Sequence, residues 1–358
     1  MNVLLLGGTG AIGTYLRDIL NTNRIPTTIS TRNPARLQEK IKYTNYVVGN
    51  AKDISFLAGI CSSHWDVIVD FMAYTSTEFK ERLDLLLNST NQYIYISSAR
   101  VYGNAEHLIR ESSPRLLDCT KDKVYLSTDE YALSKARQEN LLFENDRKNF
   151  TIVRPYITYG NERFQMGVLE KEEWLYRAIH GRTVIFSKDI ADKITTLTHG
   201  YDVAMGIYGL MGGQDALGKV FHITNKNTLK WQQIIEIYSD LLKELLGIQL
   251  KVKYVTLPCF LSMRQESLRY QVMYDRLFNR SFDTTNQSQY VSTEKFILAK
   301  DGLRDCLTAF IKHPVWKDIN WHYEAIKDRE TNEFTPLSEI KGLKNKLRYI
   351  VYRFHIKS

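Results

Sequence analysis

Tyr131 and Lys135 stand four residues apart in the stretch STDEYALSK, residues 127–135. In a helix, this spacing places both side chains on one face. A free tyrosine has a pKa of about 10, so it transfers protons near neutral pH only when a neighbouring cation favours its phenolate. Lys135 supplies such a cation, which makes Tyr131 a candidate general acid/base. Ser98 ends a predicted strand and is placed to hydrogen-bond an oxygen whose charge changes in the reaction.

The same stretch also has a purely structural interpretation. Tyr-x-x-x-Lys spacing arises by chance, and a polar run of this kind can open a surface helix. Ser127 and Glu130 have the spacing of an N-terminal capping box, in which two side chains satisfy exposed helix amides. We therefore expect residues Ser127 to Glu130 to cap the helix that carries Tyr131 and Lys135, so that the pair Asp129-Glu130 is structural.

A glycine-rich loop, GGTGAIG, follows the first predicted strand directly and opens a helix. Glycines in this context allow a tight turn and let backbone amides approach a diphosphate, which then faces the positive end of the helix. The loop therefore predicts dinucleotide binding, with a merely structural turn as the alternative. Its candidate cofactor-binding residues are Gly7, Thr9, Gly10, Ala11, Ile12 and Gly13.

The end of the second strand, in ISTRNPAR, bears on the choice of cofactor. NAD-binding sites place an acidic residue there, whereas a basic residue accommodates the 2′-phosphate of NADP. This segment has no acid and offers Arg32 and, one helical turn later, Arg36. NADP is therefore predicted, with NAD as the alternative if both arginines are simply solvated. Further candidates for the adenosine half of the cofactor are Thr31, Asn33, Asn50, Ala51 and Asp53.

The elements that must position these residues alternate in the first half of the chain. Short apolar runs alternate with amphipathic stretches such as residues 14–23 and 78–90, which is the pattern of βαβ units. We expect an α/β fold with a doubly wound parallel sheet, of the Rossmann type, and a smaller C-terminal substrate lobe. The expected strands are residues 2–7, 26–31, 42–50, 65–73, 92–98 and 150–156.

The predicted organisation has three parts. Residues 1–160 form the dinucleotide-binding domain, and 161–340 complete the sheet and form the substrate lobe. A basic amphipathic tail occupies 341–358. This tail carries six Lys/Arg and no acid, against a net charge of +8 for all 358 residues. The rest of the chain is thus nearly neutral, which argues against a general nucleic-acid-binding surface.

The tail is either an interfacial segment on an anionic membrane, giving a peripheral contact, or a helix docked on its own domain or a partner.

The remaining composition points to a cytoplasmic protein. The four cysteines form no C-x-x-C pair, so a disulfide framework is not expected, and no apolar run is long enough for a membrane span. The histidines are scattered, and no metal site is predicted. His199 is interpreted as a helix-start residue.

Several motifs then occur in order over roughly residues 1–240. They are GGTGAIG, DFMAY, SSARVYG, YALSK with Glu139 after it, RPYITYG and THGYDVA. With them the chain resembles an extended short-chain dehydrogenase/reductase of the NAD-dependent epimerase/dehydratase family, which acts on nucleotide sugars.

The resemblance implies a role for each matching residue. Tyr131 is the acid/base, Lys135 holds the nicotinamide ribose and lowers the tyrosine pKa, and Ser98 orients the substrate oxygen. Many relatives carry Asn where this chain has Ile157. The resemblance also implies a homodimer through a helix pair that includes the Tyr/Lys helix. The implied cofactor contacts are Phe71, Met72, Ala73, Tyr131, Lys135, Tyr156 and Ile157. The implied substrate contacts are Tyr74, Ser98, Ala99, Arg100 and, at a diphosphate, Arg276 or Arg280.

The absence of one family motif limits which reaction the chain is expected to catalyse. Dehydratases of this family place an Asp-Glu pair beside the catalytic threonine, whereas this chain has Ser98-Ala99-Arg100. We therefore expect an oxidoreductase: an NADPH-dependent reductase of a nucleoside-diphosphate 4-keto sugar, such as a dTDP-4-keto-6-deoxyhexose, in polysaccharide precursor biosynthesis. One alternative is a 4-epimerase with tightly bound NAD. A second is an RNA-binding, atypical member of the superfamily, which DFMAY and the basic charge also resemble.

Overall fold

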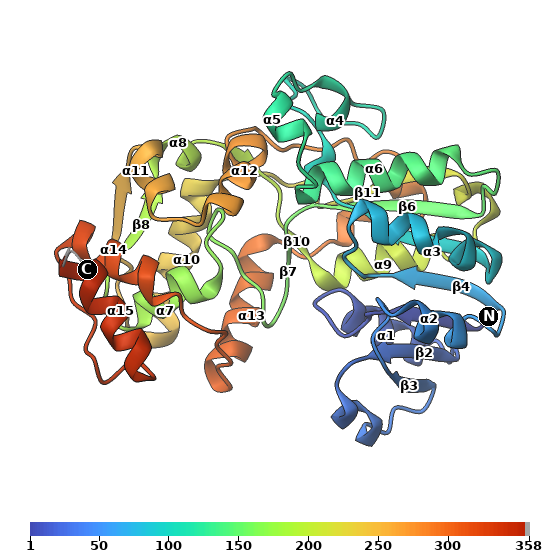
Figure 1. Cartoon of the computed structure of the whole chain (residues 1–358), viewed down its shortest axis with the longest axis horizontal. Helices are drawn as coiled ribbons and strands as arrows, with labels where there is room; N and C mark the ends of the chain where they lie inside the picture. Colours follow the sequence, from blue (N-terminus) through green and yellow to red (C-terminus); the bar gives the residue numbers. More distant parts are fainter. Residues whose placement is uncertain (355–358) are drawn as a thin grey trace. The chain divides into compact units, whose positions relative to one another are not determined.

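The computed structural model describes residues 1–354, and the chain is organised as two compact units (Figure 1). The first unit comprises Met1–Gly160, Thr196–Thr228 and Arg280–Gly302. The second comprises Asn161–Thr195, Leu229–Asn279 and the chain from Leu303 onward. The chain therefore passes between the units five times. The region 161–340 contributes to both of them.

A seven-stranded parallel sheet forms the centre of the first unit, in the order β11-β6-β5-β4-β1-β2-β3. The order reverses between β1 and β4, which is the switch point of a doubly wound sheet. This confirms the predicted fold class and all six expected strands. The strands are β1 (Val3–Leu6), β2 (Thr27–Thr31), β3 (Thr44–Val48), β4 (Trp65–Asp70), β5 (Thr90–Ile96), β6 (Phe150–Pro155) and β11 (Lys219–Ile223).

Helices cover both faces of this sheet (Figure 1). Side chains alternate along a strand, so Val3 and Leu5 of β1 join a core with α1 and α9, while Leu4 and Leu6 join the opposite core. Because both faces are buried, β1 reads as an unbroken apolar run. The helices of this unit are α1 (Gly13–Thr22), α2 (Ile54–Ile60), α3 (Ser76–Asn88), α4 (Leu116–Cys119), α5 (Lys123–Leu126), α6 (Tyr131–Glu144) and α9 (Gly200–Leu210).

The second unit is mainly helical, with two small sheets. β8 (Val184–Ser187) pairs with β13 (Val252–Val255), and β9 (Ile194–Thr195) pairs with β12 (Leu229–Lys230). A further short pair, β7 (Thr158–Tyr159) and β10 (Thr198–His199), belongs to the first unit. The remaining helices are α7 (Lys171–Ile179), α8 (Lys188–Ala191), α10 (Trp231–Leu246), α11 (Leu257–Ser262), α12 (Arg269–Gln271), α13 (Ala299–Lys312), α14 (Trp321–Thr331) and α15 (Leu343–Phe354).

A buried ion cluster joins two helices and a loop of the second unit. Arg177 of α7 has no exposed side-chain surface, and its guanidinium contacts Glu324 and Asp328 of α14 at 2.9 and 2.8 Å. It also reaches Glu333 at 3.1 Å. The three carboxylates, together with the Thr183 carbonyl that accepts from the Arg177 Nε at 2.9 Å, give the buried charge the partners that it requires. In the part of the chain that is described, no helix is both long enough and apolar enough to cross a membrane.

Candidate functional site

The glycine loop lies between β1 and α1 and allows the closest approach of the backbone. Gly7 has φ of +69°, a left-handed conformation that favours glycine. A Cβ on Gly13 would lie 2.4 Å from the carbonyl oxygen of Gly8, so α1 packs directly on the loop. A Cβ on Gly10 would meet no atom within 4 Å. The loop therefore leaves an open cradle before helix amides that no side chain caps, which fits the diphosphate of a dinucleotide.

The end of β2 carries the residues expected to choose between NAD and NADP. Asn33 caps the short 3₁₀ turn Pro34–Gln38 by accepting a hydrogen bond from the Ala35 amide at 3.0 Å. Arg36 forms an ion pair with Glu39, which occupies its guanidinium. Arg32 is exposed and has no ion pair with any residue up to Phe354. Of the two arginines, Arg32 is thus the better placed for a phosphate, and that role stays a prediction.

The segment after β4 borders the glycine loop. A Cβ on Gly7 would lie 2.7 Å from the Met72 sulfur, so this side chain packs against the loop. Phe71 is half-buried and Ala73 is exposed beside it. Met72 therefore lies against the loop, and contact of the three residues with a cofactor stays a prediction.

The segment after β3 divides into a core residue and an exposed one. Ala51 is 3% exposed and packs in the core. Asn50 is exposed, and its side-chain oxygen accepts a hydrogen bond from the Lys52 amide at 3.2 Å. Asp53 caps α2 through the amides of Ser55 and Phe56. Of the candidates Asn50 and Ala51, Asn50 is therefore the one whose side chain is exposed.

Tyr131 and Lys135 line one cavity of about 270 Å³ at the start of α6. Tyr131 is 42% exposed, and the Arg100 guanidinium lies 5.2 Å from the centroid of its ring. Ser98 is not among the residues that line this cavity. The structure thus brings the predicted acid/base and its lysine together with two more predicted contacts. The other lining residues are Lys52, Ala73, Tyr74, Thr75, Asp129 and Ser134.

Lys135 is almost fully buried behind Tyr131. Its ammonium donates a hydrogen bond to the carbonyl oxygen of Ile96 at 2.8 Å and lies 4.5 Å from the centroid of the Tyr95 ring. Burial lowers the pKa of Lys135 to about 8, while the negative charges of Asp70 and Glu139 oppose that shift. The ammonium is therefore close to its titration point in mildly alkaline solution.

Asp70 is a buried residue of the site that the sequence-based prediction did not single out. It ends β4 with 1% exposure and accepts hydrogen bonds from the Tyr93 hydroxyl at 2.8 Å and the Met72 amide at 2.9 Å. Burial raises the pKa of its carboxyl group, although these hydrogen bonds and Lys135 lower it. An acidic residue that closes an apolar strand was the available signal.

Ser98 begins a short 3₁₀ turn after β5. Its Oγ accepts a hydrogen bond from the Arg100 amide at 3.2 Å, and its side chain is 7% exposed. Arg100 forms an ion pair with Glu130 at 2.6 Å, and its guanidinium faces Tyr131. Ala99 is fully buried, so it contributes packing rather than an accessible side chain.

The capping box predicted for Ser127 and Glu130 was wrong. Ser127 ends the preceding helix α5, and its hydroxyl donates a hydrogen bond to the Val124 carbonyl at 2.8 Å. Because that turn takes the Ser127 hydroxyl, α6 begins four residues later, at Tyr131. Its N-cap is Glu130, whose carboxylate accepts a hydrogen bond from the Ala132 amide at 2.8 Å.

Asp129 holds a different helix. Its carboxylate accepts hydrogen bonds from the Ser76 amide at 3.0 Å and the Ser76 hydroxyl at 2.6 Å, at the start of α3. Burial would raise the pKa of Asp129, but these bonds and Arg137 lower it overall. The prediction that Asp129 and Glu130 are structural acids is therefore confirmed, although each caps a separate helix.

The segment after β6 contains a backbone outlier. Tyr156 is 1% exposed and packs against Phe282, with ring centroids 5.2 Å apart. Ile157 has φ of +29°, a region that β-branched residues rarely adopt and that Asn and Gly tolerate. Its carbonyl accepts a hydrogen bond from the Thr198 amide at 3.2 Å. The position where many relatives carry Asn is thus one where Asn suits the backbone.

Tyr74, predicted to contact substrate, lines the cavity of Tyr131 but turns its ring into the core. It is 6% exposed and lies against Phe79 and, at 4.4 Å, the Arg82 guanidinium. Burial raises its pKa well above the usual value for tyrosine. The Tyr74 side chain is therefore mainly a core residue at the edge of the cavity.

The two arginines expected at a substrate diphosphate belong to different units. Arg276 is 2% exposed and donates to the Gly167 carbonyl at 3.0 Å. Arg280 is fully buried and donates to the carbonyls of Gly103 and Tyr102 at 2.9 and 3.0 Å. Both guanidinium groups hold the main chain here, and contact with a diphosphate stays a prediction.

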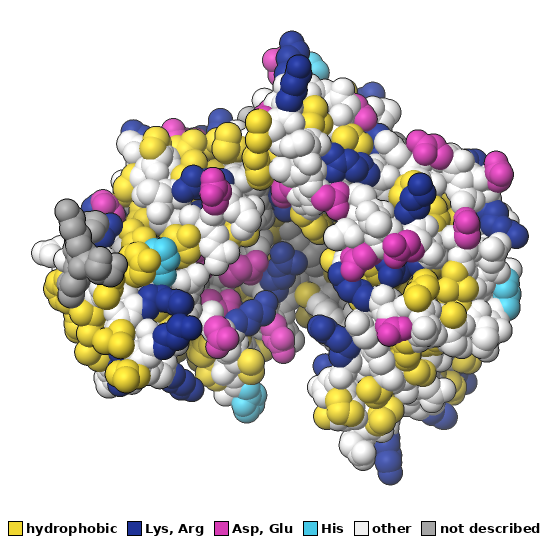
Figure 2. Space-filling model, in the orientation of Figure 1, with side chains coloured by type: hydrophobic (Ala, Val, Ile, Leu, Met, Phe, Trp, Pro, Cys, Tyr) yellow, Lys and Arg dark blue, Asp and Glu magenta, His cyan; other side chains and the backbone are white. Residues whose placement is uncertain are grey.

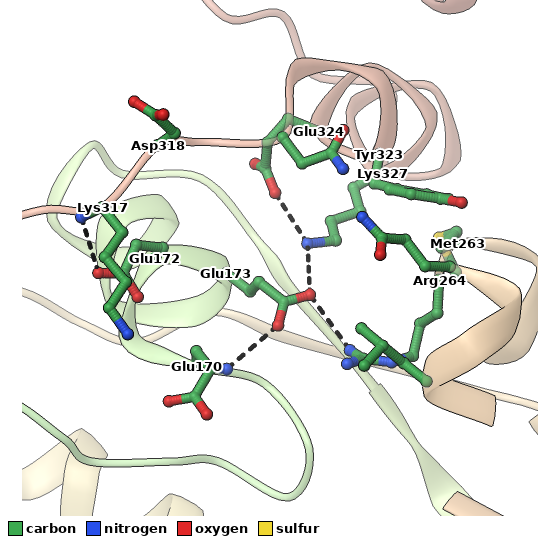
Figure 3. Close-up of a pocket in the computed structure, with 13 residues that line it drawn as sticks. Glu170, Glu172, Glu173, Met263, Arg264, Lys317, Asp318, Tyr323, Glu324 and Lys327 are labelled. Carbon is green, nitrogen blue, oxygen red and sulfur yellow. Dashed lines mark hydrogen bonds and ion pairs between the residues drawn. The ribbon is translucent and has the colours of Figure 1, made fainter. Parts of the chain in front are cut away.

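A second cavity, of about 190 Å³, lies within the second unit (Figure 3). Figure 3 shows the Glu173 carboxylate pointing toward Arg264 and Lys327. Its Oε1 lies 3.2 Å from the Arg264 guanidinium and 3.8 Å from the Lys327 ammonium, which also contacts Glu324 at 2.8 Å. The buried charges of this cavity therefore largely compensate one another.

Two smaller expectations concern histidines and metals. His199 caps α9 by accepting a hydrogen bond from the Tyr201 amide at 3.1 Å, which confirms it as a helix-start residue. Within residues 1–354, no group of three or more His, Cys, Asp or Glu side chains is arranged to hold a metal ion.

Known proteins resemble this chain in sequence and in fold. The model of the family described as "RmlD substrate binding domain" matches residues 1–244. The chloroplast stem-loop binding protein of 41 kDa b from Arabidopsis thaliana is 25% identical over 238 residues, which is 63% of this chain. The chain spans 58% of the length of that curated relative.

Solved structures share the fold at low sequence identity. Epimerase Mth375 from Methanothermobacter thermautotrophicus has a TM-score of 0.66 at 15% identity, covering 87% of this chain and 92% of its own. WbmH from Bordetella bronchiseptica, solved with NAD+, has a TM-score of 0.67 at 13% identity, covering 88% and 99%. The dTDP-glucose 4,6-dehydratase of Bacillus anthracis, also solved with NAD, has a TM-score of 0.65 at 17% identity, covering 88% and 98%.

The similar solved structures agree with the fold of this chain. The fold expected from the resemblance to short-chain dehydrogenases/reductases is confirmed. The family model matches residues 1–244, which is more than half of this chain, so the chain belongs to the RmlD substrate binding domain family.

Proposed function

We propose that this protein is an NADPH-dependent oxidoreductase that reduces the 4-keto group of a nucleoside-diphosphate sugar. The observation that carries the proposal is the shared cavity of Tyr131 and Lys135 at the carboxyl edge of the sheet. The glycine loop, with its open cradle at Gly10, lies at the end of β1 in the same unit. A titratable hydroxyl beside a buried ammonium is the arrangement that protonates a developing alkoxide.

The chain's own residues have distinct parts in this reaction. A bound nicotinamide dinucleotide supplies the hydride. The Tyr131 hydroxyl donates a proton to the carbonyl oxygen as the ketone becomes an alcohol. Lys135 keeps positive charge beside that hydroxyl, which stabilises the phenolate left behind. The Arg100 guanidinium also lies 5.2 Å from the centroid of the Tyr131 ring, but its charge is paired with Glu130.

The choice of NADPH over NAD rests on the end of β2. Arg32 is exposed without an ion-pair partner among residues 1–354, and β2 is followed by no acid that would bind ribose hydroxyls. The solved relatives with a similar fold include proteins crystallised with NAD, so NAD is the alternative and a 4-epimerase is the alternative reaction.

A direct assay tests the proposal. Purified protein with NADPH and a dTDP-4-keto-6-deoxy sugar is expected to consume NADPH, as measured by loss of reduced-cofactor absorbance. The Tyr131→Phe variant is expected to bind NADPH equally well and to lose activity by about 10²–10⁴-fold. Tight copurification of NAD, with sugar interconversion and no net change of cofactor, would instead identify an epimerase.

One observation favours a second candidate function. The curated relative is named as a stem-loop binding protein, so RNA binding deserves its own assay. Retention of stem-loop RNA that persists when Lys344 and Arg348 are changed to Ser, with no turnover of any 4-keto sugar, would support that function. The nearly neutral body of the chain argues for the enzyme instead.

A further inference from the structure

Helix α15 is attached to the second unit through one of its faces. Tyr349 is fully buried, and its hydroxyl donates a hydrogen bond to Asp328 of α14 at 2.6 Å while accepting one from the Thr335 amide at 2.7 Å. Asp328 also contacts the buried Arg177. This contact confirms that the predicted tail helix docks on its own chain, and it fixes the rotation of the helix about its axis.

The opposite face of α15 carries an exposed apolar stripe. Leu343, Leu347 and Phe354 are 73%, 56% and 56% exposed. At about 100° per residue, these three side chains fall within a narrow sector that faces away from Tyr349. Phe334, which is 47% exposed, extends the stripe, because its ring centroid lies 6.2 Å from that of Phe354. We call these four residues the apolar stripe.

Cations flank the apolar stripe on both sides. By helical geometry, Lys344 and Arg348 lie along one edge and Lys346 along the other. None of the three forms an ion pair with any residue up to Phe354, and residues 341–358 contain no acid. The nearby acids are occupied, since Glu333 holds Arg177 and Glu339 holds Arg182. In Figure 2, hydrophobic and basic side chains lie together over the part of the second unit where Figure 1 draws α14 and α15.

An apolar stripe with cationic edges fits one kind of partner. A second copy of this helix would bring a second set of unpaired cations against the first. A nucleic acid would use the cations and leave the stripe in water. An anionic lipid surface satisfies both features, since acyl chains cover the stripe while headgroups neutralise its edges. We infer that α15 binds the surface of an anionic lipid membrane, lying in the plane of the interface.

The test uses the full-length protein and vesicles. Flotation with vesicles of phosphatidylglycerol and phosphatidylcholine is expected to carry the protein, and pure phosphatidylcholine vesicles are expected to carry much less. Changing Lys344 and Arg348 to Ser is expected to lower partitioning about 25-fold, at about fivefold per cation. Changing Leu343 and Leu347 to Ser is expected to lower it by at least about tenfold.

Matched variants elsewhere on the surface serve as controls. Leu37→Ser with Leu108→Ser, at 55% and 57% exposure, and Lys121→Ser with Lys123→Ser are expected to leave partitioning unchanged. All variants alter exposed side chains, and an unchanged Tm checks that each one folds.

Three results would overturn the inference. One is the absence of flotation with anionic vesicles. Another is that the lysine and arginine changes abolish vesicle binding while the leucine changes leave it intact. That result would indicate binding through charge alone, as expected for an RNA-binding surface. The third is concentration-dependent self-association that the leucine changes abolish.

Discussion

Lys135 is the residue whose charge should set the upper pH limit of the proposed reaction. Burial lowers its pKa to about 8. Its ammonium is therefore lost as pH rises through 8, and Tyr131 then lacks its neighbouring cation. We expect kcat/KM for ketone reduction to fall above about pH 8. A Lys135→Met variant should be slower throughout and should lack this descending limb. If kcat/KM of the Lys135→Met variant still falls at the same pH, a group other than Lys135 is responsible for the decrease.

Asp202 offers a test of stability at a single residue. It is buried in the first turn of α9 and accepts a hydrogen bond from the Ile297 amide at 2.8 Å. Burial raises its pKa from 3.8 to about 6, although this hydrogen bond opposes the shift. Between these values the folded state binds a proton that the unfolded state has released, so stability falls as pH rises.

The Asp202→Asn variant removes that charge and keeps an acceptor for Ile297. We expect it to raise the free energy of unfolding by about 1–3 kcal/mol at pH 7.5 and to have little effect at pH 4. Urea unfolding at the two pH values measures this difference. A variant that is less stable at both values would mean that the carboxylate is needed as such.

At the level of elements, Glu139 fixes α6 against the sheet. It is fully buried and accepts hydrogen bonds from the Arg154 guanidinium at 2.6 and 2.8 Å, the Ser97 hydroxyl at 2.6 Å and Arg115 at 3.2 Å. It thereby joins the helix of Tyr131 and Lys135 to the ends of β5 and β6. The geometry of the site thus depends on a residue that does not touch the cavity.

We expect Glu139→Gln to lower the free energy of unfolding by about 3–5 kcal/mol, because it leaves a buried arginine charge without its partner. Denaturant unfolding measures this loss. The matched control is Glu294→Gln, which breaks an exposed pair with Lys226 and should change stability little. Adding Arg154→Met to the Glu139 variant should recover part of the loss, and a purely additive result would argue against the pairing.

The elements differ in how far the sequence allowed their prediction. The strands were predictable because a parallel strand buried on both faces is a continuous apolar run, as in VLLL of β1. The start of α6 was not, because two helices compete for Ser127 and the outcome depends on local geometry. The lowered pKa of Lys135 was not predictable either, because Tyr95 and Ile96, which lie against its ammonium, belong to strand β5 and are distant in sequence from α6.

At the scale of the whole molecule, the two units cannot be separated by a single cut. The sequence predicted residues 1–160 as a complete domain. However, β11 and α9 of this unit come from later parts of the chain, and Phe282 and Phe296 pack in its cores. We expect a fragment of residues 1–160 to expose the edge of β6 and one face of α1. It should therefore aggregate or unfold without cooperativity, as monitored by circular dichroism and sedimentation, while the full chain does neither. Cooperative unfolding of the fragment would contradict this.

Because the chain passes repeatedly between the two units, the first unit cannot be completed until late in synthesis. The first unit gains its last segment, Arg280–Gly302, about 140 residues after Gly160. At a synthesis rate of about 5–20 residues per second, the ribosome needs roughly 7–28 s to supply that segment. In the first part of this interval the nascent sheet lacks its edge strand β11, and until the end of it the sheet lacks part of its apolar cover, such as Phe296. The growing chain is thus a natural client for chaperones, and its yield in a cell should depend on translation speed as well as on final stability.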